Sequence, residues 1–217
     1  MNNISIETQF LKFPTSMISD ALDEIGIYGA ISGVTAQRHD QGRIAGRALP
    51  VKFEKKNKDP KAWRFGGGVG KPLEQVLKIM SKGQVVVMDL QGALNATAWG
   101  GLASKLAQKK GVVGTIMHGT CRDLEEIREC GYPVWAIGVC PRRSRNDFTF
   151  GSINETISVT NVEISKNDII VADQSGVVCV PEQEINKVLE LLKKISKQEE
   201  LLEDQVLQNI IQNWDEL

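Results

Sequence analysis

The feature that most constrains the fold is a regular alternation of apolar runs and amphipathic stretches between residues 72 and 137. The run Val-Val-Val-Met at residues 85–88 is typical of a strand that is buried on both faces. The alternation predicts helices at 72–80, 97–110 and 123–130, and strands at 84–90, 112–117 and 133–137. Strands and helices in this order indicate a parallel α/β core with right-handed crossovers.

The segments on either side of this core follow other patterns. Apolar residues between 17 and 25 recur on one helical face, and Gly26 should end that helix. Residues 44–53 predict a strand, in which Pro50 should place the far end at an edge or in a bulge. Residues 54–71 are expected to form a loop. Short strands are predicted at 157–159, 162–164, 169–172 and 177–180, the last two joined by a turn at residues 173–176.

The chain ends in a long amphipathic helix that begins at Pro181. Its apolar positions, from Ile185 to Ile210, keep helical spacing almost to the C-terminus. At about 1.5 Å per residue, some thirty residues span roughly 45 Å, more than one small domain can cover. We therefore expect residues 1–180 to form one α/β domain and residues 181–217 to form an arm that packs on a neighbouring subunit. The alternative is a helix that wraps around its own domain or frays after Lys197.

Composition excludes several classes of protein. The formal net charge of −1 does not fit the strongly basic surface of a nucleic-acid-binding protein. Two basic clusters occur, at residues 52–58 and 142–145, and we interpret the first as a solvated loop. Four cysteines and two histidines lack the spacing of a structural zinc site and fit a reducing compartment. Because neither a signal peptide nor an apolar run of about 20 residues is evident, we expect a cytoplasmic protein without membrane partners.

Two segments at predicted strand ends carry candidate binding groups. The glycine pair at 100–101 stands near a helix start, where unpaired N–H groups and the helix dipole can bind a carboxylate or phosphate. Arg122 and Asp123 follow the next strand, and the carboxyl ends of adjacent parallel strands form the ligand crevice of open α/β sheets. Arg122 can clamp a keto acid, and Asp123 offers hard oxygens to Mg²⁺ or Mn²⁺. The alternative is structural: Asp123 caps its helix, and Arg122 pairs with Glu125 or Glu126.

This region resembles the core of the RraA-like family, which includes 4-hydroxy-4-methyl-2-oxoglutarate aldolases. The run A-x-G-G-L-A…G-x-x-G…G-x-x-R-D, from Ala98 to Asp123, carries the likeness. Similar flanking motifs lie at residues 19–23, 46–48, 133–136 and 173–178, so the resemblance covers roughly residues 15–200. Its specificity lies in the order and spacing of the motifs rather than in any one of them.

The resemblance implies a swivelling β/β/α-type fold with a long C-terminal helix, assembled as a homotrimer or homohexamer with active sites at subunit interfaces. In aldolase members the Arg of the R-D pair binds the oxo-acid and the Asp holds a divalent metal, roles that fall on Arg122 and Asp123. A glutamate from a neighbour's C-terminal helix completes the site, and Glu199 matches best, with Glu200 as the alternative. Backbone amides that bind the pyruvyl carboxylate fall on Gly100, Gly101, Leu102 and Ala103.

The sequence departs from the aldolase pattern at one position. Aldolases carry an acidic residue about twenty positions before the R-D pair, and here that position is Gly101. A carboxylate that could orient the metal's waters or relay protons is therefore missing from it. His118 stands where aldolases often have Asp. It could supply an acid/base group near pH 7, or it is a structural histidine whose hydrogen bonds are satisfied.

We therefore expect a divalent-metal-dependent lyase that cleaves a carbon–carbon bond in a pyruvate-containing keto acid. Retro-aldol cleavage of 4-hydroxy-4-methyl-2-oxoglutarate-type substrates and oxaloacetate decarboxylation share an enolate, whose charge a metal would stabilise. The alternative, from another class, is a non-catalytic regulator that binds ribonuclease E, as some relatives do. The glycine-rich segment 66–70 is a surface loop or a cover for the site. Cys121 would be a nucleophile only if its thiol were activated.

Overall fold

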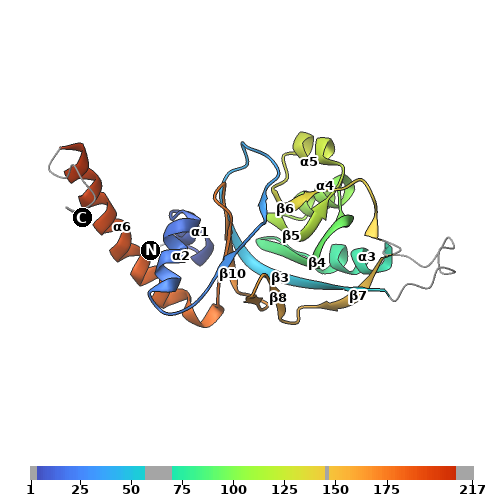
Figure 1. Cartoon of the computed structure of the whole chain (residues 1–217), viewed down its shortest axis with the longest axis horizontal. Helices are drawn as coiled ribbons and strands as arrows, with labels where there is room; N and C mark the ends of the chain where they lie inside the picture. Colours follow the sequence, from blue (N-terminus) through green and yellow to red (C-terminus); the bar gives the residue numbers. More distant parts are fainter. Residues whose placement is uncertain (1–3, 57–69, 145–146, 209–217) are drawn as a thin grey trace.

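The computed structural model describes residues 4–56, 70–144 and 147–208. The chain forms an α/β body from which one long helix extends (Figure 1). At the centre, four parallel strands pair in chain order. They are β3 (Ile44–Lys55), β4 (Gln84–Trp99), β5 (Gly114–Cys121) and β6 (Val134–Val139). The parallel α/β core that the alternation predicted is therefore confirmed.

Antiparallel strands extend this core at both edges, so the sheet is mixed rather than purely parallel. On one side β10 (Ile169–Ala172) pairs with β3, β11 (Val177–Val180) with β10, and β1 (Ala30–Ile31) with β11. On the other side β2 (Thr35–Ala36) pairs with β6. A separate hairpin is formed by β8 (Ile157–Val159) and β9 (Val162–Ile164). The four short strands predicted between residues 157 and 180 all occur with the predicted bounds.

Pro50 lies inside β3, which has neighbours along both sides. The first half of β3 pairs with β10 through residues 44–47, and the second half pairs with β7 (Phe148–Ile153) through residues 51–55. Pro50 stands between these two pairings, where its missing N–H costs no ladder hydrogen bond. The expected irregularity occurs two residues later, as a shift in register with β7 between Lys52 and Phe53.

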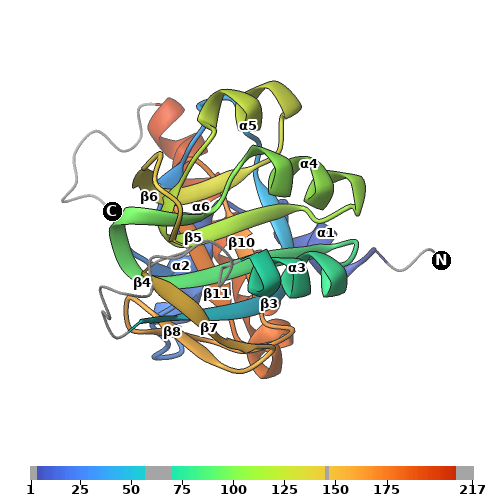
Figure 2. The same ribbon diagram turned by 90° about the vertical axis from the view of Figure 1, so that its right-hand side faces the viewer.

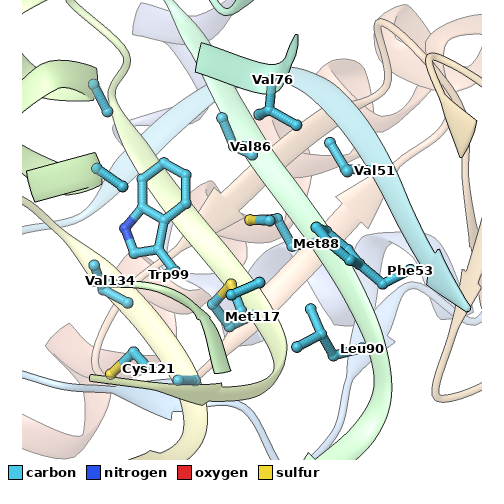
Figure 3. Close-up of a cluster of buried hydrophobic side chains, with 14 of the residues drawn as sticks. Val51, Phe53, Val76, Val86, Met88, Leu90, Trp99, Met117, Cys121 and Val134 are labelled. Atoms are coloured by element: carbon cyan, nitrogen blue, oxygen red, sulfur yellow. The ribbon is translucent and has the colours of Figure 1, made fainter. Parts of the chain in front are cut away.

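The two faces of the sheet have different covers. Helices α3 (Gly70–Ile79), α4 (Gly101–Lys109) and α5 (Leu124–Cys130) lie together on one face (Figure 2). Beneath them, Met88, Trp99 and Met117 belong to one buried cluster (Figure 3). The alternate residues Val85 and Val87 point to a second cluster that includes residues of the β8–β9 hairpin. Because residues 85–90 of β4 are buried between these two clusters, the run at 85–88 is continuously apolar rather than alternating.

Helices from both ends of the chain pack together against β10 and β11. Phe10 of α1 (Ile6–Phe10) and Leu22 of α2 (Thr15–Asp23) are fully buried in the same cluster as Leu192. Leu192 belongs to α6 (Ile185–Leu207), which follows a short 3₁₀ turn, η3 (Glu182–Glu184). The first half of α6 therefore packs on the chain's own body. The second half extends beyond it (Figure 1) and exposes Leu201, Leu202, Val206 and Leu207.

The predicted helix at 97–110 is wrong at its start. It begins at Gly101, and residues 97–99 are the end of β4. Within β4, Gln91 and Gly92 take left-handed conformations, and the register with β5 shifts there and again further on. The strand thus bends and continues through a stretch of small residues that resembles the start of a helix. Helix α1 and strands β1, β2 and β7 were not predicted.

Candidate functional site

A cavity of about 200 Å³ opens where β4 and β5 end and α4 and α5 begin. This volume is below that of typical drug-sized pockets, so the cavity suits a small metabolite. Apolar and polar groups share its surface. Its lining consists of Leu73, Thr97, Ala98, Trp99, Gly100, Leu102, Ala103, Arg122, Asp123, Arg143 and Ser144. The strand-end crevice expected from the parallel sheet is therefore present.

Asp123 connects the two strand ends. It stands at the N-cap position of α5 in a left-handed conformation, and its side chain makes no cap hydrogen bond to that helix. Instead, Oδ1 accepts a hydrogen bond from Arg122 Nε at 2.8 Å, and Oδ2 accepts one from the Gly101 N–H at 3.3 Å. The carboxylate therefore reaches across to the start of α4. The structural alternative, in which Asp123 caps its own helix, is wrong.

Arg122 is held on the same side of the crevice. Its backbone N–H donates to the Trp99 carbonyl at 3.0 Å, which ties the end of β5 to the end of β4. Its guanidinium pairs with Asp123, while Glu126 pairs with Lys105 at 3.2 Å. The alternative pairing of Arg122 with Glu125 or Glu126 is therefore not observed. About a quarter of each side chain in the Arg122–Asp123 pair is exposed, which leaves both accessible from the cavity.

Gly100 and Gly101 allow two carboxylates to approach the first turn of α4. A Cβ added at Gly100 would lie 2.6 Å from Asp123 Oδ2, and one at Gly101 would lie 2.4 Å from Glu126 Oε2. Such distances are far below van der Waals contact, so neither site accepts a side chain without movement. Glu126 thus fills the space that a side chain at position 101 would need. A carboxylate is close to this helix start although the sequence places glycine there.

The amides expected to bind an anion are in part already used. The Gly101 N–H bonds to Asp123, and Gly101 is not among the residues lining the cavity, whereas Gly100, Leu102 and Ala103 are. The N–H groups of Leu102 and Ala103 lie in the first helical turn, where no intrahelical partner exists. These two amides, with the helix dipole, are the groups left for a ligand anion.

Two other predicted candidates lie away from this cavity. His118 Nδ1 is 2.7 Å from Oδ1 of Asp89, a carboxylate that is 5% exposed, and His118 does not line the cavity. This contact agrees with the structural alternative, in which the hydrogen bond of His118 is satisfied. Glu199 lies on the exposed half of α6, outside the cavity of its own chain. Of the glycine-rich segment 66–70, residues 66–69 lie outside the described residues, and Gly70 begins α3.

Cys121 is a buried structural cysteine in this fold. Burial raises the pKa of its thiol to about 11, while its backbone hydrogen bond and the charge of Arg128 act in the opposite direction. The side chain is fully buried in the cluster under α3–α5. Because the reactive species is the thiolate, Cys121 is poorly suited to nucleophilic catalysis near neutral pH.

Three residues near the site were not predicted from the sequence to belong to it. Arg143 and Ser144 line the cavity from the segment that follows β6, and Glu126 covers Gly101. The basic cluster at 142–145 was a visible signal for Arg143. No local sequence signal connects Glu126 to Gly101, because their contact depends on the angle between α4 and α5.

The donor set at the cavity fits a hydrated divalent cation rather than a closed metal site. The described part of the chain holds no group of three or more His, Cys, Asp or Glu side chains that could share a metal. Among the described lining residues, Asp123 supplies the carboxylate. Mg²⁺ commonly keeps several waters and binds through one or two carboxylates together with substrate oxygens. Asp123 has the chemistry for such a site, whereas a structural zinc site would need four ligands.

Comparison with known proteins gives a consistent family and fold. The family model described as RraA-like: Aldolase/RraA matches residues 15–179. Protein DlpA of Legionella pneumophila is 28% identical over 181 residues, which are 83% of this chain and 28% of that protein. The 4-hydroxy-4-methyl-2-oxoglutarate aldolase of Thermus thermophilus is 32% identical over 145 residues, which are 63% of this chain and 86% of that protein.

A solved structure shows the same fold over nearly the whole chain. RraAS2 of Streptomyces coelicolor, described as an unusual member of the RNase ES inhibitor RraA protein family, matches with a TM-score of 0.80. The match covers 91% of this chain and 95% of that chain at 22% identity. At this identity the likeness shows the fold alone.

Within the described residues, no helix combines the length and the apolar character that crossing a bilayer requires.

Proposed function

The chain belongs to the RraA-like (Aldolase/RraA) family, and from this premise we propose that it is a divalent-metal-dependent lyase. It would cleave a carbon–carbon bond in a pyruvate-containing keto acid, by retro-aldol cleavage of a 4-hydroxy-4-methyl-2-oxoglutarate-type substrate, by decarboxylation of oxaloacetate, or by both. The observation that carries the proposal is that Arg122, Asp123 and the first turn of α4 share one small cavity. A relative named as an aldolase supports the same reaction class.

Each group of the chain has a defined task in this reaction. Arg122 presents N–H donors in a fixed plane and suits the carboxylate and keto oxygens of the substrate. The amides of Leu102 and Ala103 stabilise negative charge at the helix start. In retro-aldol cleavage the C4 hydroxyl gives its proton to water, and C4 becomes the keto carbon of one pyruvate as the C3–C4 bond breaks. The electron pair of that bond passes to the C2 oxygen of an enolate, which takes up a proton from water at C3 to give the second pyruvate. Preorganised donors around that oxygen lower the barrier because its charge grows as the bond breaks.

Asp123 is the proposed metal ligand. A divalent cation held there would supply Lewis-acid polarisation of the substrate's keto group. Arg122 keeps the Asp123 carboxylate oriented through the 2.8 Å hydrogen bond to Oδ1. Decarboxylation of oxaloacetate develops charge on the same oxygen, so the same donors serve both reactions.

We further propose that the active unit is a homotrimer or homohexamer in which Glu199 of a second copy completes the site. The exposed half of α6 supports this, because Leu201, Leu202, Val206 and Leu207 form no part of the chain's own core. Large apolar side chains gathered on one helix favour contact with another protein surface. A monomeric mass in light scattering would contradict this assembly.

Pyruvate release tests the activity. With Mg²⁺, the wild type is expected to release pyruvate from 4-hydroxy-4-methyl-2-oxoglutarate or oxaloacetate, measured with lactate dehydrogenase and NADH, and EDTA should abolish it. Asp123→Ala should reduce kcat/KM at least about 100-fold, the usual cost of losing a group that stabilises developing charge. Asp23→Ala, which removes an exposed carboxylate from α2, is the matched control and should retain full activity. Absence of turnover on both acids, together with binding to ribonuclease E, would favour the non-catalytic regulator instead.

A further inference from the structure

The segment after β6 carries two adjacent arginines with different environments. Arg142 donates to the Asn95 carbonyl at 3.2 Å and pairs with Asp147 at 2.9 Å. Arg143 lines the cavity and makes no hydrogen bond or ion pair with the described residues. Its backbone is nevertheless fixed, since Thr97 N–H donates to the Arg142 carbonyl at 2.9 Å and Thr97 forms a β-bridge with Arg143. Arg143 is thus an exposed, cationic lining residue on a fixed backbone, without a hydrogen-bond or ion-pair partner among the described residues.

Ser144 gives a second, independent indication of a ligand. It lines the same cavity and is 1% exposed, yet its Oγ has no hydrogen-bond partner among the described residues. Most buried side-chain polar atoms are paired, so an unpaired hydroxyl beside a cavity indicates a ligand or water partner. A serine hydroxyl can donate to an anionic oxygen.

The described lining of the cavity carries one more positive charge than negative charge. Arg122 and Asp123 neutralise each other as an ion pair, whereas Arg143 remains uncompensated within the described lining. Leu73 and the largely exposed Leu102 add apolar surface to the same cavity. A ligand that satisfies all of these groups has one anionic end for Arg122 and the start of α4, a short carbon chain, and a second anionic end.

We propose that Arg143 and Ser144 form a second anion subsite that binds the distal carboxylate of the substrate and determines specificity for keto diacids. The inference rests on the proposed function, which places the keto-acid end of the substrate at Arg122 and Asp123. Arg143 and Ser144 bind the end that is not held there. They are specificity-determining residues and take no part in bond cleavage.

Equilibrium binding of two matched acids tests this subsite. 2-Oxoglutarate and 2-oxopentanoate have the same keto-acid end and chain length, but a methyl group replaces the distal carboxylate in the second. By calorimetry with Mg²⁺, the wild type should bind 2-oxoglutarate about 10- to 100-fold more tightly, the range expected for a hydrogen-bonded charge pair. Arg143→Gln should remove most of this difference and leave the affinity for 2-oxopentanoate unchanged. Ser144→Ala should reduce the preference for 2-oxoglutarate over 2-oxopentanoate by about 2- to 10-fold.

A charge-matched control separates the subsite from general electrostatics. Lys109→Gln removes one positive charge from the exposed C-terminal end of α4 and should leave both affinities as in the wild type. Equal binding of the two acids by the wild type would overturn the proposal. So would an equal loss of both acids in Arg143→Gln, or no binding of either acid.

The binding assay also separates this inference from the proposed activity. If the wild type discriminates between the two acids but releases no pyruvate from any keto acid, the subsite stands and the lyase proposal fails. If pyruvate is released and Arg143→Gln retains the preference for 2-oxoglutarate, the lyase stands and the subsite fails.

Discussion

Replacement of Gly100 by alanine tests the packing that brings Asp123 to the start of α4. The backbone of Gly100 is extended, with φ −160° and ψ −169°, so alanine causes no backbone strain there. The added methyl would lie 2.6 Å from Asp123 Oδ2 and 2.9 Å from Arg122 Cγ. Both neighbours are side-chain atoms, so the expected response is displacement of the Arg122–Asp123 pair rather than unfolding.

The magnitude follows from two opposing effects. Reduced freedom of the unfolded chain stabilises a Gly→Ala variant by about 0.4–1 kcal/mol. Forcing a methyl group into a filled space costs about 1–3 kcal/mol. Gly100→Ala should therefore lose about 1–2 kcal/mol in free energy of unfolding, and its Tm should fall by about 2–8 °C, given about 2–4 °C per kcal/mol at this chain length. Urea denaturation with an unchanged slope would measure the loss.

A double-mutant cycle identifies the cause of that loss. Asp123→Ala removes the carboxylate nearest to the added methyl, so Gly100→Ala should cost less than about 0.5 kcal/mol in that background. Gly42→Ala is the matched control, because a Cβ at Gly42 would meet no atom within 4 Å. A Gly100→Ala variant as stable as the wild type, or one whose loss is the same with and without Asp123, would exclude this steric conflict.

Two further predictions follow from shifted pKa values. Burial raises the pKa of Cys121 to about 11. Iodoacetamide at pH 8 should therefore label the half-buried Cys130 in the native protein, and Cys121 only after unfolding. Rapid labelling of Cys121 in the native protein, seen by peptide mass spectrometry, would contradict this. Burial by itself raises the pKa of Asp173, but hydrogen bonds from Thr15 and Arg43 lower it below its usual value. A lowered folded-state pKa gives stability that is present above the unfolded value of about 3.9 and is lost as pH falls through the folded value. Asp173→Asn should therefore flatten the decline in urea midpoint below about pH 4. Parallel plots of urea midpoint against pH for the variant and the wild type would refute this prediction.

The central strands and the location of the site were predictable because both follow from the same property of parallel sheets. A continuous apolar run at 85–88 indicates a strand buried on both faces, and consecutive parallel strands bring their carboxyl ends to one edge. The glycines after β4 and the Arg-Asp pair after β5 therefore meet whatever the detailed packing. The start of α4 was not predictable in the same way. Residues 93–98 alternate alanine with Leu94, Asn95 and Thr97, and only the pairing of Ala93, Thr97 and Trp99 with β5 shows that this stretch belongs to β4.

Contacts between elements that approach each other at an angle could not be predicted from the sequence pattern. Glu126 lies next to Gly101, 25 positions earlier in the sequence, only because α5 packs beside α4. In this packing the Glu126 side chain lies against the first turn of α4. Arg143 and Ser144 reach the cavity because a bridge to Thr97 folds the segment after β6 back onto β4. Periodicity describes the face of one element, whereas these contacts depend on the relative placement of two.

The conformation of Asp123 explains why the Arg-Asp pair serves the cavity rather than its own helix. Non-glycine residues pay on the order of 1 kcal/mol or more for a left-handed backbone, and Asp123 has φ 54° and ψ 45°. An aspartate in an extended N-cap conformation would bond its own helix, but here the carboxylate bonds the Gly101 N–H of α4 and Arg122. An acid that approaches the Gly101 amide therefore competes with Asp123 Oδ2, whereas no side chain of the described residues bonds to the amides of Leu102 and Ala103. Under the proposed function, we expect the carboxylate of the keto acid to bind one residue further along α4, next to Asp123 rather than in its place.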